Sequence, residues 1–122
     1  MESPTDMHKA GDAVFDSVAE LFSLLSTPIR LKIISALCHG EKNVSQLLAE
    51  IDTTQPNMSQ HLSTLYRAGV LGKRRDSTQI YYRLQSERVA TLCRAVCTQV
   101  AIELDPEVRV EPTDRLLPAN VR

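Results

Sequence analysis

Polar hydrogen-bonding side chains gather on one side of a helical stretch in the middle of the chain, residues 55–69. Its apolar residues Met58, Leu62 and Leu65 recur at helical spacing, so this stripe must be buried. The other side carries amides, hydroxyls, an imidazole and a guanidinium: Gln55, Asn57, Ser59, Gln60, His61, Ser63, Thr64 and Arg67. Amides and hydroxyls pair with the edges of DNA bases, and Asn and Gln do so bidentately with adenine. A solvated face without a partner is the alternative interpretation.

Three cysteines form the second set of chemically active residues: Cys38, Cys93 and Cys97. An odd number at irregular spacing argues against the disulfide framework of a secreted protein. Free thiols, metal ligands and redox groups remain as interpretations. Cys93 and Cys97 are four residues apart, which places them one turn apart on one face of a helix. For each cysteine, the alternative is a small buried hydrophobic residue.

The charge of the chain is unevenly distributed. The formal net charge of the 122 residues is −1. Residues 1–26 hold five acidic residues and one lysine, a net charge of −4, whereas residues 42–83 hold six basic and three acidic residues, a net charge of +3. A basic middle between acidic ends favours a polyanionic partner on one surface.

Length and composition predict one cytoplasmic domain. A hydrophobic fraction of 43% is ordinary for a globular protein, and 122 residues suffice for one core. No apolar run approaches the ~18 residues of a membrane span, so no membrane partner is expected. The polar N-terminus lacks the apolar segment of a signal peptide.

Hydrophobic periodicity predicts five helices, and Thr27, Asn43 and Ser86 are the expected N-caps of the second, third and last. The predicted helices cover residues 13–25, 28–38, 44–51, 55–68 and 87–104. Two strands, 70–72 and 79–84, are joined by a charged hairpin tip at 73–78. Residues 1–12 are expected to be a disordered acidic tail and residues 105–122 a flexible tail, which leaves one domain at 13–104.

Two short helices and a tight turn, followed by a hairpin, predict a winged helix-turn-helix. The fold class is therefore mainly α with a small β-hairpin wing (α+β). Its second helix enters the DNA major groove. The basic residues Arg67, Lys73, Arg74 and Arg75 are expected on phosphates or in the minor groove. The apolar stripe of the last helix repeats about every 3.5 residues and has little else to bury, which favours a dimer seam.

Five segments resemble the ArsR/SmtB family of bacterial winged-helix repressors. They are LSTPIRLKII (residues 25–34), QPNMSQHL (55–62), AGVL (68–71), KRRD (73–76) and IYYRL (80–84). The resemblance extends over about residues 14–100. It implies a homodimer packed through the first and last helices, bound to double-stranded DNA at an imperfect inverted repeat in its own promoter. It also implies release of that DNA on arrival of an inducer.

The sequence departs from the metal-sensing members of that family. Their Cys-x-Cys site on the third helix falls on Asn43 and Ser45. Their zinc site on the last helix needs Asp and His, and it falls on Ser86, Arg88, Gln99 and Ile102. Neither site is expected in this chain.

The three thiols leave two sensing chemistries open. Members that sense sulfide or oxidants with two thiols have cysteines that fall here on Ser35 and Ala101, so Cys38 lies about three residues later and Cys97 four earlier. Antiparallel packing of the two helices compensates for both shifts and lets Cys38 and Cys97 form a disulfide or polysulfide bridge. Alternatively, Cys38, Cys93 and Cys97 together bind As(III) or another soft thiophilic ion.

Two other classes of protein are weighed against a repressor. No Cys-x-x-Cys, nucleophile elbow or phosphate loop is present, so an enzyme is not expected. A protein-interaction module that does not bind DNA is the alternative. It predicts no steep dependence of DNA affinity on salt, whereas a repressor that contacts several phosphates must show one.

Overall fold

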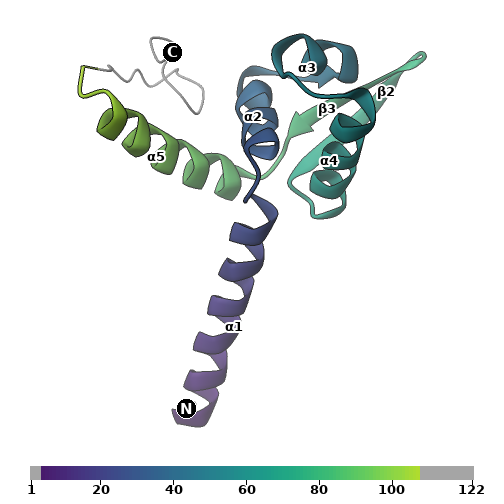
Figure 1. The fold of residues 1–122 in the computed structure, drawn as a ribbon. Coiled ribbons are helices and arrows are strands. Elements are labelled where there is room, and N and C mark those ends of the chain that lie inside the picture. The colour runs from purple at the N-terminus through teal and green to yellow at the C-terminus, as the bar shows by residue number, and fades with distance from the viewer. Residues whose placement is uncertain (1–3, 108–122) are drawn as a thin grey trace.

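The structure, a computed structural model, describes residues 4–107. Its elements follow the predicted order of helices and strands. They are α1 (Pro4–Leu24), α2 (Pro28–Ala36), the 3-10 helix η1 (Leu37–His39), β1 (Lys42–Asn43), α3 (Val44–Glu50), α4 (Gln55–Arg67), β2 (Leu71–Asp76), β3 (Gln79–Leu84) and α5 (Glu87–Leu104). The predicted α+β winged helix-turn-helix is confirmed (Figure 1).

Side-chain caps fix where the helices begin. Thr27 accepts a hydrogen bond from the backbone N–H of Arg30 at 3.1 Å, and Ser86 accepts one from Val89 at 3.2 Å. Asn43 and Gln46 form a reciprocal capping box, with both bonds at 2.9 Å. All three predicted caps are thus confirmed, because a short polar side chain satisfies backbone donors that have no partner within the helix.

The first helix begins nine residues earlier than predicted. We expected a disordered tail at 1–12, but α1 already includes Pro4. Proline is compatible with a first helical turn, and the sequence of that turn includes Asp6, an acidic residue of the type that helix N-termini favour. Apolar periodicity misses such a segment because it registers buried faces. Residues 108–122, most of the predicted C-terminal tail, lie outside the described residues.

The sheet has three antiparallel strands in the order β1-β3-β2, and β1 was not predicted. The pair Asp76↔Gln79 closes the hairpin, leaving Ser77 and Thr78 as a two-residue turn in which Ser77 has φ 59°. The predicted charged tip at 73–78 was therefore wrong. The basic residues lie within β2, an edge strand, where charged side chains point into water and discourage pairing with another chain.

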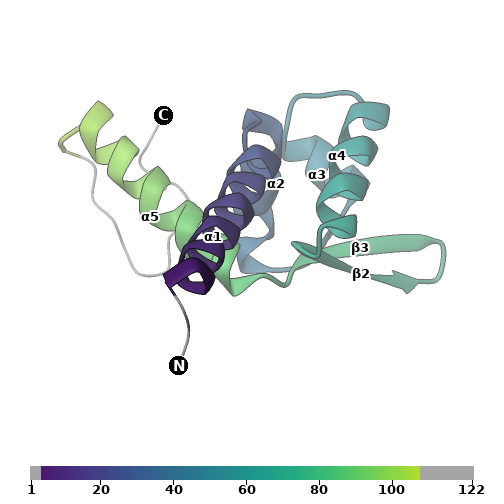
Figure 2. The same cartoon turned by 90° about the horizontal axis from the view of Figure 1, so that it is seen from below.

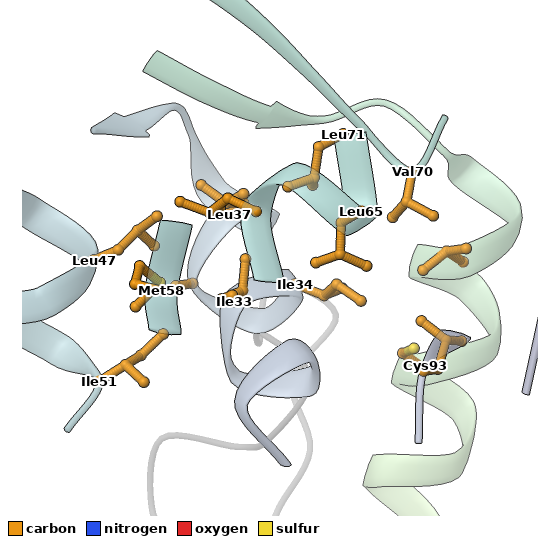
Figure 3. Close-up of a cluster of buried hydrophobic side chains, with 14 residues drawn as sticks. Ile33, Ile34, Leu37, Leu47, Ile51, Met58, Leu65, Val70, Leu71 and Cys93 are labelled. Atoms are coloured by element: carbon orange, nitrogen blue, oxygen red, sulfur yellow. The ribbon is translucent and has the colours of Figure 1, made fainter. Parts of the chain in front are cut away.

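One hydrophobic core joins α2, α3, α4, the base of the hairpin and α5 (Figure 3). Met58, Leu62 and Leu65 of α4 are fully buried, as the stripe predicted. Each such side chain contributes about 1.5–3 kcal/mol relative to exposure. This packing fixes α4 with its other face turned outward.

The long helices lie at the margin of that body. Figures 1 and 2 show α5 across α2 from α4, and α1 extending away from the body as a single rod. Among the described residues, no single helix is long and apolar enough to cross a membrane. One pair of helices, Lys9–Leu24 and Pro28–His39, reaches the required length and hydropathy only when the two are taken together, and this pair is bent by 87°.

Candidate nucleic-acid interface

The outer face of α4 is built on a row of residues four apart. Because Met58, Leu62 and Leu65 are buried at 0% exposure, the opposite face is turned to solvent. The predicted residues on that face are exposed: Gln55, Ser59, Gln60, Ser63 and Arg67. Thr54 caps the helix by accepting a hydrogen bond from the backbone N–H of Asn57 at 3.2 Å, so α4 presents its N-terminal turn in a fixed direction.

The other three predicted residues of α4 are half-buried and hold intramolecular hydrogen bonds. Asn57 Nδ2 donates to Thr53 Oγ1 at 2.7 Å, which ties the helix to the preceding turn. The Thr64 hydroxyl donates to the Gln60 carbonyl at 3.0 Å. His61 Nδ1 accepts a hydrogen bond from Arg30 Nε at 3.1 Å. The structure therefore divides the predicted set into exposed side chains and side chains that support the helix.

The basic residues of the wing are held by neighbours. Lys73 Nζ lies 4.2 Å from the centroid of the Tyr66 ring, so a cation–π contact joins β2 to the end of α4. Arg75 Nε donates to the Ser77 carbonyl at 3.1 Å and so braces the turn of the hairpin. Of the wing cations, Lys73 and Arg75 have no acidic partner among the described contacts.

Arg74 is held most tightly of the wing residues. Its Nε donates to both carboxylate oxygens of Glu41 at 2.9 Å, its Nη1 lies 3.7 Å from Asp76, and its guanidinium stacks on Tyr81 at 4.9 Å. The hydrogen bond that Arg74 donates to Glu41 is the main cause that raises the pKa of Arg74 above its usual value. Glu41 was not among the predicted residues. No sequence signal pairs it with Arg74, because the two are 33 residues apart and meet only through the sheet.

Arg83 is a further cation that the predicted set omitted. It pairs with Gly72 in the β2–β3 register, and a Cβ at Gly72 would lie 2.6 Å from Arg83 Cζ. Glycine thus lets the guanidinium lie across the neighbouring strand. The exposed cations Arg67, Lys73, Arg75 and Arg83 and the outer face of α4 make up the candidate interface.

The three thiols lie on η1 and α5, elements that carry none of the residues of the candidate interface. Cys93 of α5 is 4% exposed and points into the core cluster (Figure 3). Burial, then the neighbouring thiols Cys97 and Cys38, raises the pKa of Cys93 to about 11. Burial and then Cys38 also raise the pKa of Cys97. Cys38 and Cys97 are half-buried and pack against the same core that Cys93 enters, and the three together are hereafter called the thiol cluster.

The thiol cluster is not arranged as a metal site. Within residues 4–107 no group of three or more His, Cys, Asp or Glu side chains is placed to hold a metal ion. The Cys38 thiol donates to the Ile34 carbonyl at 3.3 Å, and Cys93 is inside the core. The predicted three-cysteine site for a soft ion is therefore not formed in this structure, in which none of the three cysteines forms a disulfide bond.

The sequence and the fold match a known family. Residues 27–73, which span α2 to the start of the wing, match the family model described as "Bacterial regulatory protein, arsR family". The "Biofilm growth-associated repressor" of Xylella fastidiosa (strain Temecula1) is 38% identical over 77% of this chain and 82% of its own length. The chain belongs to the arsR family.

Solved structures of related regulators agree with this assignment. The transcriptional repressor BigR from Xylella fastidiosa superposes with a TM-score of 0.64 at 36% identity, over 78% of this chain and 93% of that one. Rv0081 of M. tuberculosis gives a TM-score of 0.67 at 30% identity, over 79% and 97%. This arsR-family protein is thus a DNA-binding transcriptional repressor and not an enzyme, as predicted.

Proposed function

We propose that the protein acts as a homodimer on an inverted-repeat operator and that oxidation of Cys38 and Cys97 releases it. The supporting observation is that Cys38 of η1 and Cys97 of α5 both pack against the core that Cys93 enters, and that Cys38 acts electrostatically on both thiols of α5. Helix α5 also carries large apolar side chains that no other described residue covers, including Val96, Val100 and Leu104. Chemistry at the cluster is thereby able to act on both the core and α5.

Exposed apolar side chains on α1 and α5 support the homodimer. Phe15 of α1 is 74% exposed and Leu104 of α5 is 82% exposed. The full set of such side chains on the two helices is Val14, Phe15, Val18, Phe22, Val96, Val100, Ile102 and Leu104. Monomers rarely expose so many large apolar side chains on two helices, and a second copy related by twofold symmetry would cover them with its own equivalents.

The dimer explains how α4 reads DNA. Twofold symmetry places two α4 helices on successive turns of one face of the duplex, about 34 Å apart. The exposed amides and hydroxyls of α4 meet base edges, and Arg67, Lys73, Arg75 and Arg83 meet phosphates. Binding must therefore weaken steeply as salt rises.

The redox step uses two thiols and a two-electron oxidant. Hydrogen peroxide accepts two electrons and two protons from Cys38 and Cys97, becomes two water molecules and leaves one disulfide. With a polysulfide as the oxidant, the thiolate of one cysteine attacks a sulfur atom of the polysulfide, forms a persulfide on that cysteine and releases a polysulfide that is one sulfur atom shorter. The second thiolate then attacks the persulfide, which gives the same disulfide and hydrosulfide. Burial raises the pKa of both α5 thiols, to about 11 for Cys93, so Cys93 keeps its proton at neutral pH and is a poor nucleophile, while Cys97 reacts through a smaller thiolate fraction than a free thiol has.

Binding to a duplex selected by the reduced protein from randomised DNA tests this proposal. Peroxide or polysulfide is expected to release the wild type and Cys93→Ala but not Cys38→Ser or Cys97→Ser. Arsenite and mercury(II) are added separately, since one relative is named a probable mercury resistance operon repressor. Release by either ion that needs all three cysteines would show a soft-ion sensor instead. DNA that stays bound under every treatment would make the cysteines core residues only.

The homodimer has its own test. Phe15→Asp places a charge in the proposed interface and is expected to give monomers in sedimentation and to lower operator affinity at least tenfold. Phe15→Leu keeps the surface apolar and is the matched control. A dimer that survives Phe15→Asp and Phe22→Asp together would place the interface elsewhere.

A further inference from the structure

One side chain, Arg30 of α2, joins α1 to the DNA-binding helix. Its Nη1 donates to the carbonyl of Leu24, the last residue of α1, at 2.8 Å. Its Nε donates to His61 Nδ1 in the middle of α4 at 3.1 Å. Its own backbone N–H is fixed by the Thr27 cap. A planar guanidinium reaches two acceptors in fixed directions, which an ammonium group does not.

His61 lies at a sensitive point of α4. The residue before it, Gln60, is exposed on the outer face, and the residue after it, Leu62, is fully buried. A hydrogen bond at His61 therefore limits rotation of α4 about its axis. Such a rotation would move the base-contacting side chains along the edges of the base pairs. A small change in the orientation of α4 would therefore break sequence-specific contacts before it broke phosphate contacts.

The protonation state of His61 fits this role. Nδ1 accepts from Arg30, which assigns the ring proton to Nε2 in a neutral imidazole. Burial, followed by the charge of Arg30, lowers the pKa of His61 and so keeps it neutral. Arg30 on α2 is the charged group that acts on this ring among the described residues.

We propose that Arg30 is a positioning residue for DNA recognition, which sets the orientation of α4 relative to α1 through His61 and the Leu24 carbonyl. The inference rests on the proposed homodimer, because α1 carries part of its interface. In that dimer the hydrogen bonds of Arg30 to His61 and to the Leu24 carbonyl, hereafter the Arg30 bridge, set the separation and tilt of the two α4 helices. Operator binding requires both helices in register, whereas non-specific binding requires only phosphate contacts.

The measured quantity is the ratio of affinities for the selected duplex and for a scrambled duplex of equal length at one salt concentration. Arg30→Met and Arg30→Lys are both expected to lower this ratio about tenfold. Arg30→Lys keeps the positive charge, so a lower ratio in this variant must come from the lost hydrogen-bond geometry and not from the charge. Lys32→Met, on the exposed side of the same helix, removes a charge without touching α4 and is expected to leave the ratio unchanged.

Two further measurements exclude a merely structural role. His61→Ala is expected to lower the ratio, and the double variant to be no worse than Arg30→Met alone, because Arg30→Met already breaks the hydrogen bond to His61. Nitrogen-15 NMR of the wild type should show His61 with the proton on Nε2, and Arg30→Lys should mix the two tautomers. These spectra need only folded protein.

Each outcome decides between the proposals. An unchanged ratio in Arg30→Lys, or additive losses in the double variant, would overturn the positioning role while wild-type binding leaves the proposed function standing. A wild type that binds selected and scrambled DNA equally would overturn the proposed function, and the positioning role with it. Should Arg30→Met fail to fold, Arg30→Lys and His61→Ala carry the same test.

Discussion

Helices α4 and α5 use the same kind of buried face but differ in the face that remains outside. In α4 the buried stripe is Met58, Leu62 and Leu65, and the outer face is polar apart from Tyr66. In α5 the buried residues are Val89, Cys93 and Ala101, yet large apolar side chains such as Val96 and Leu104 remain exposed. The outer face indicates the partner: α4 presents hydrogen-bonding groups suited to DNA, and α5 an apolar surface suited to protein.

The largest expected effect is a loss of stability, and it should differ between a buried residue of α4 and an exposed residue of α5. Leu62→Ala empties a fully buried position in α4 and should lower the free energy of unfolding by about 2–5 kcal/mol. Val100→Ala, on the exposed face of α5, should cost the domain less than about 1 kcal/mol and appear mainly in the dimer dissociation constant. Urea unfolding and sedimentation measure both. Equal losses in unfolding free energy would contradict the division between the faces.

Alkaline pH should weaken the packing of α5 through Cys93. The pKa of this thiol is raised from 9.0 to about 11 in the folded chain, so the folded state keeps a proton that the unfolded state releases between these values. Stability should therefore be nearly unaffected below pH 9 and fall by about 2 kcal/mol as pH rises to 11. Comparing the urea unfolding of wild type and Cys93→Ala across this range isolates the effect from that of other groups. Parallel pH curves for the two proteins would be evidence against it.

The outer face of α4 should govern sequence preference without affecting stability. Gln60→Ala removes an exposed amide and is expected to cost about 1–3 kcal/mol on the preferred sequence while relaxing the preference at one base pair. Arg75→Ala in β2 should instead weaken binding to all sequences about equally and reduce the dependence of affinity on salt. Binding to a set of single-base variants of the selected duplex distinguishes the two patterns. Identical profiles for both substitutions would remove α4 as the reading element.

Local periodicity predicted far more of α4 than of the wing. A helix places residues three and four apart on one face, so Met58, Leu62 and Leu65 sufficed to turn Gln55 and Ser59 outward. The wing depends on pairing between distant residues, which no local pattern encodes. The contact of Glu41 with Arg74, the strand at Lys42–Asn43 and the approach of Arg83 to Gly72 were missed for that reason.

The same limit applies to the Arg30 bridge. His61 was predicted to face DNA because it lies in α4, yet a partner 31 residues earlier in the chain holds its Nδ1. Side-chain contacts across the core decide whether a polar residue of a helix is available to a ligand. Sequence therefore predicted helix α4 and its exposed outer face, whereas the contacts that support this helix came only from the fold.

The smallest expected effect concerns Arg74 in the wing, which is already paired with an acidic residue, unlike the exposed side chains on the outer face of α4. Glu41 holds Arg74 by two hydrogen bonds and so competes with any phosphate for this guanidinium. Glu41→Gln removes that competing charge and is expected to raise affinity for all DNA sequences by about two- to fivefold, as for the loss of one exposed ion pair. Glu50→Gln, which breaks the exposed ion pair with Lys42, is the matched control for a general change in charge. The gain should shrink as salt rises, since screening weakens both the ion pair and the phosphate contact. An equal gain in Glu50→Gln would mean that net charge alone, and not the freed Arg74, increases binding.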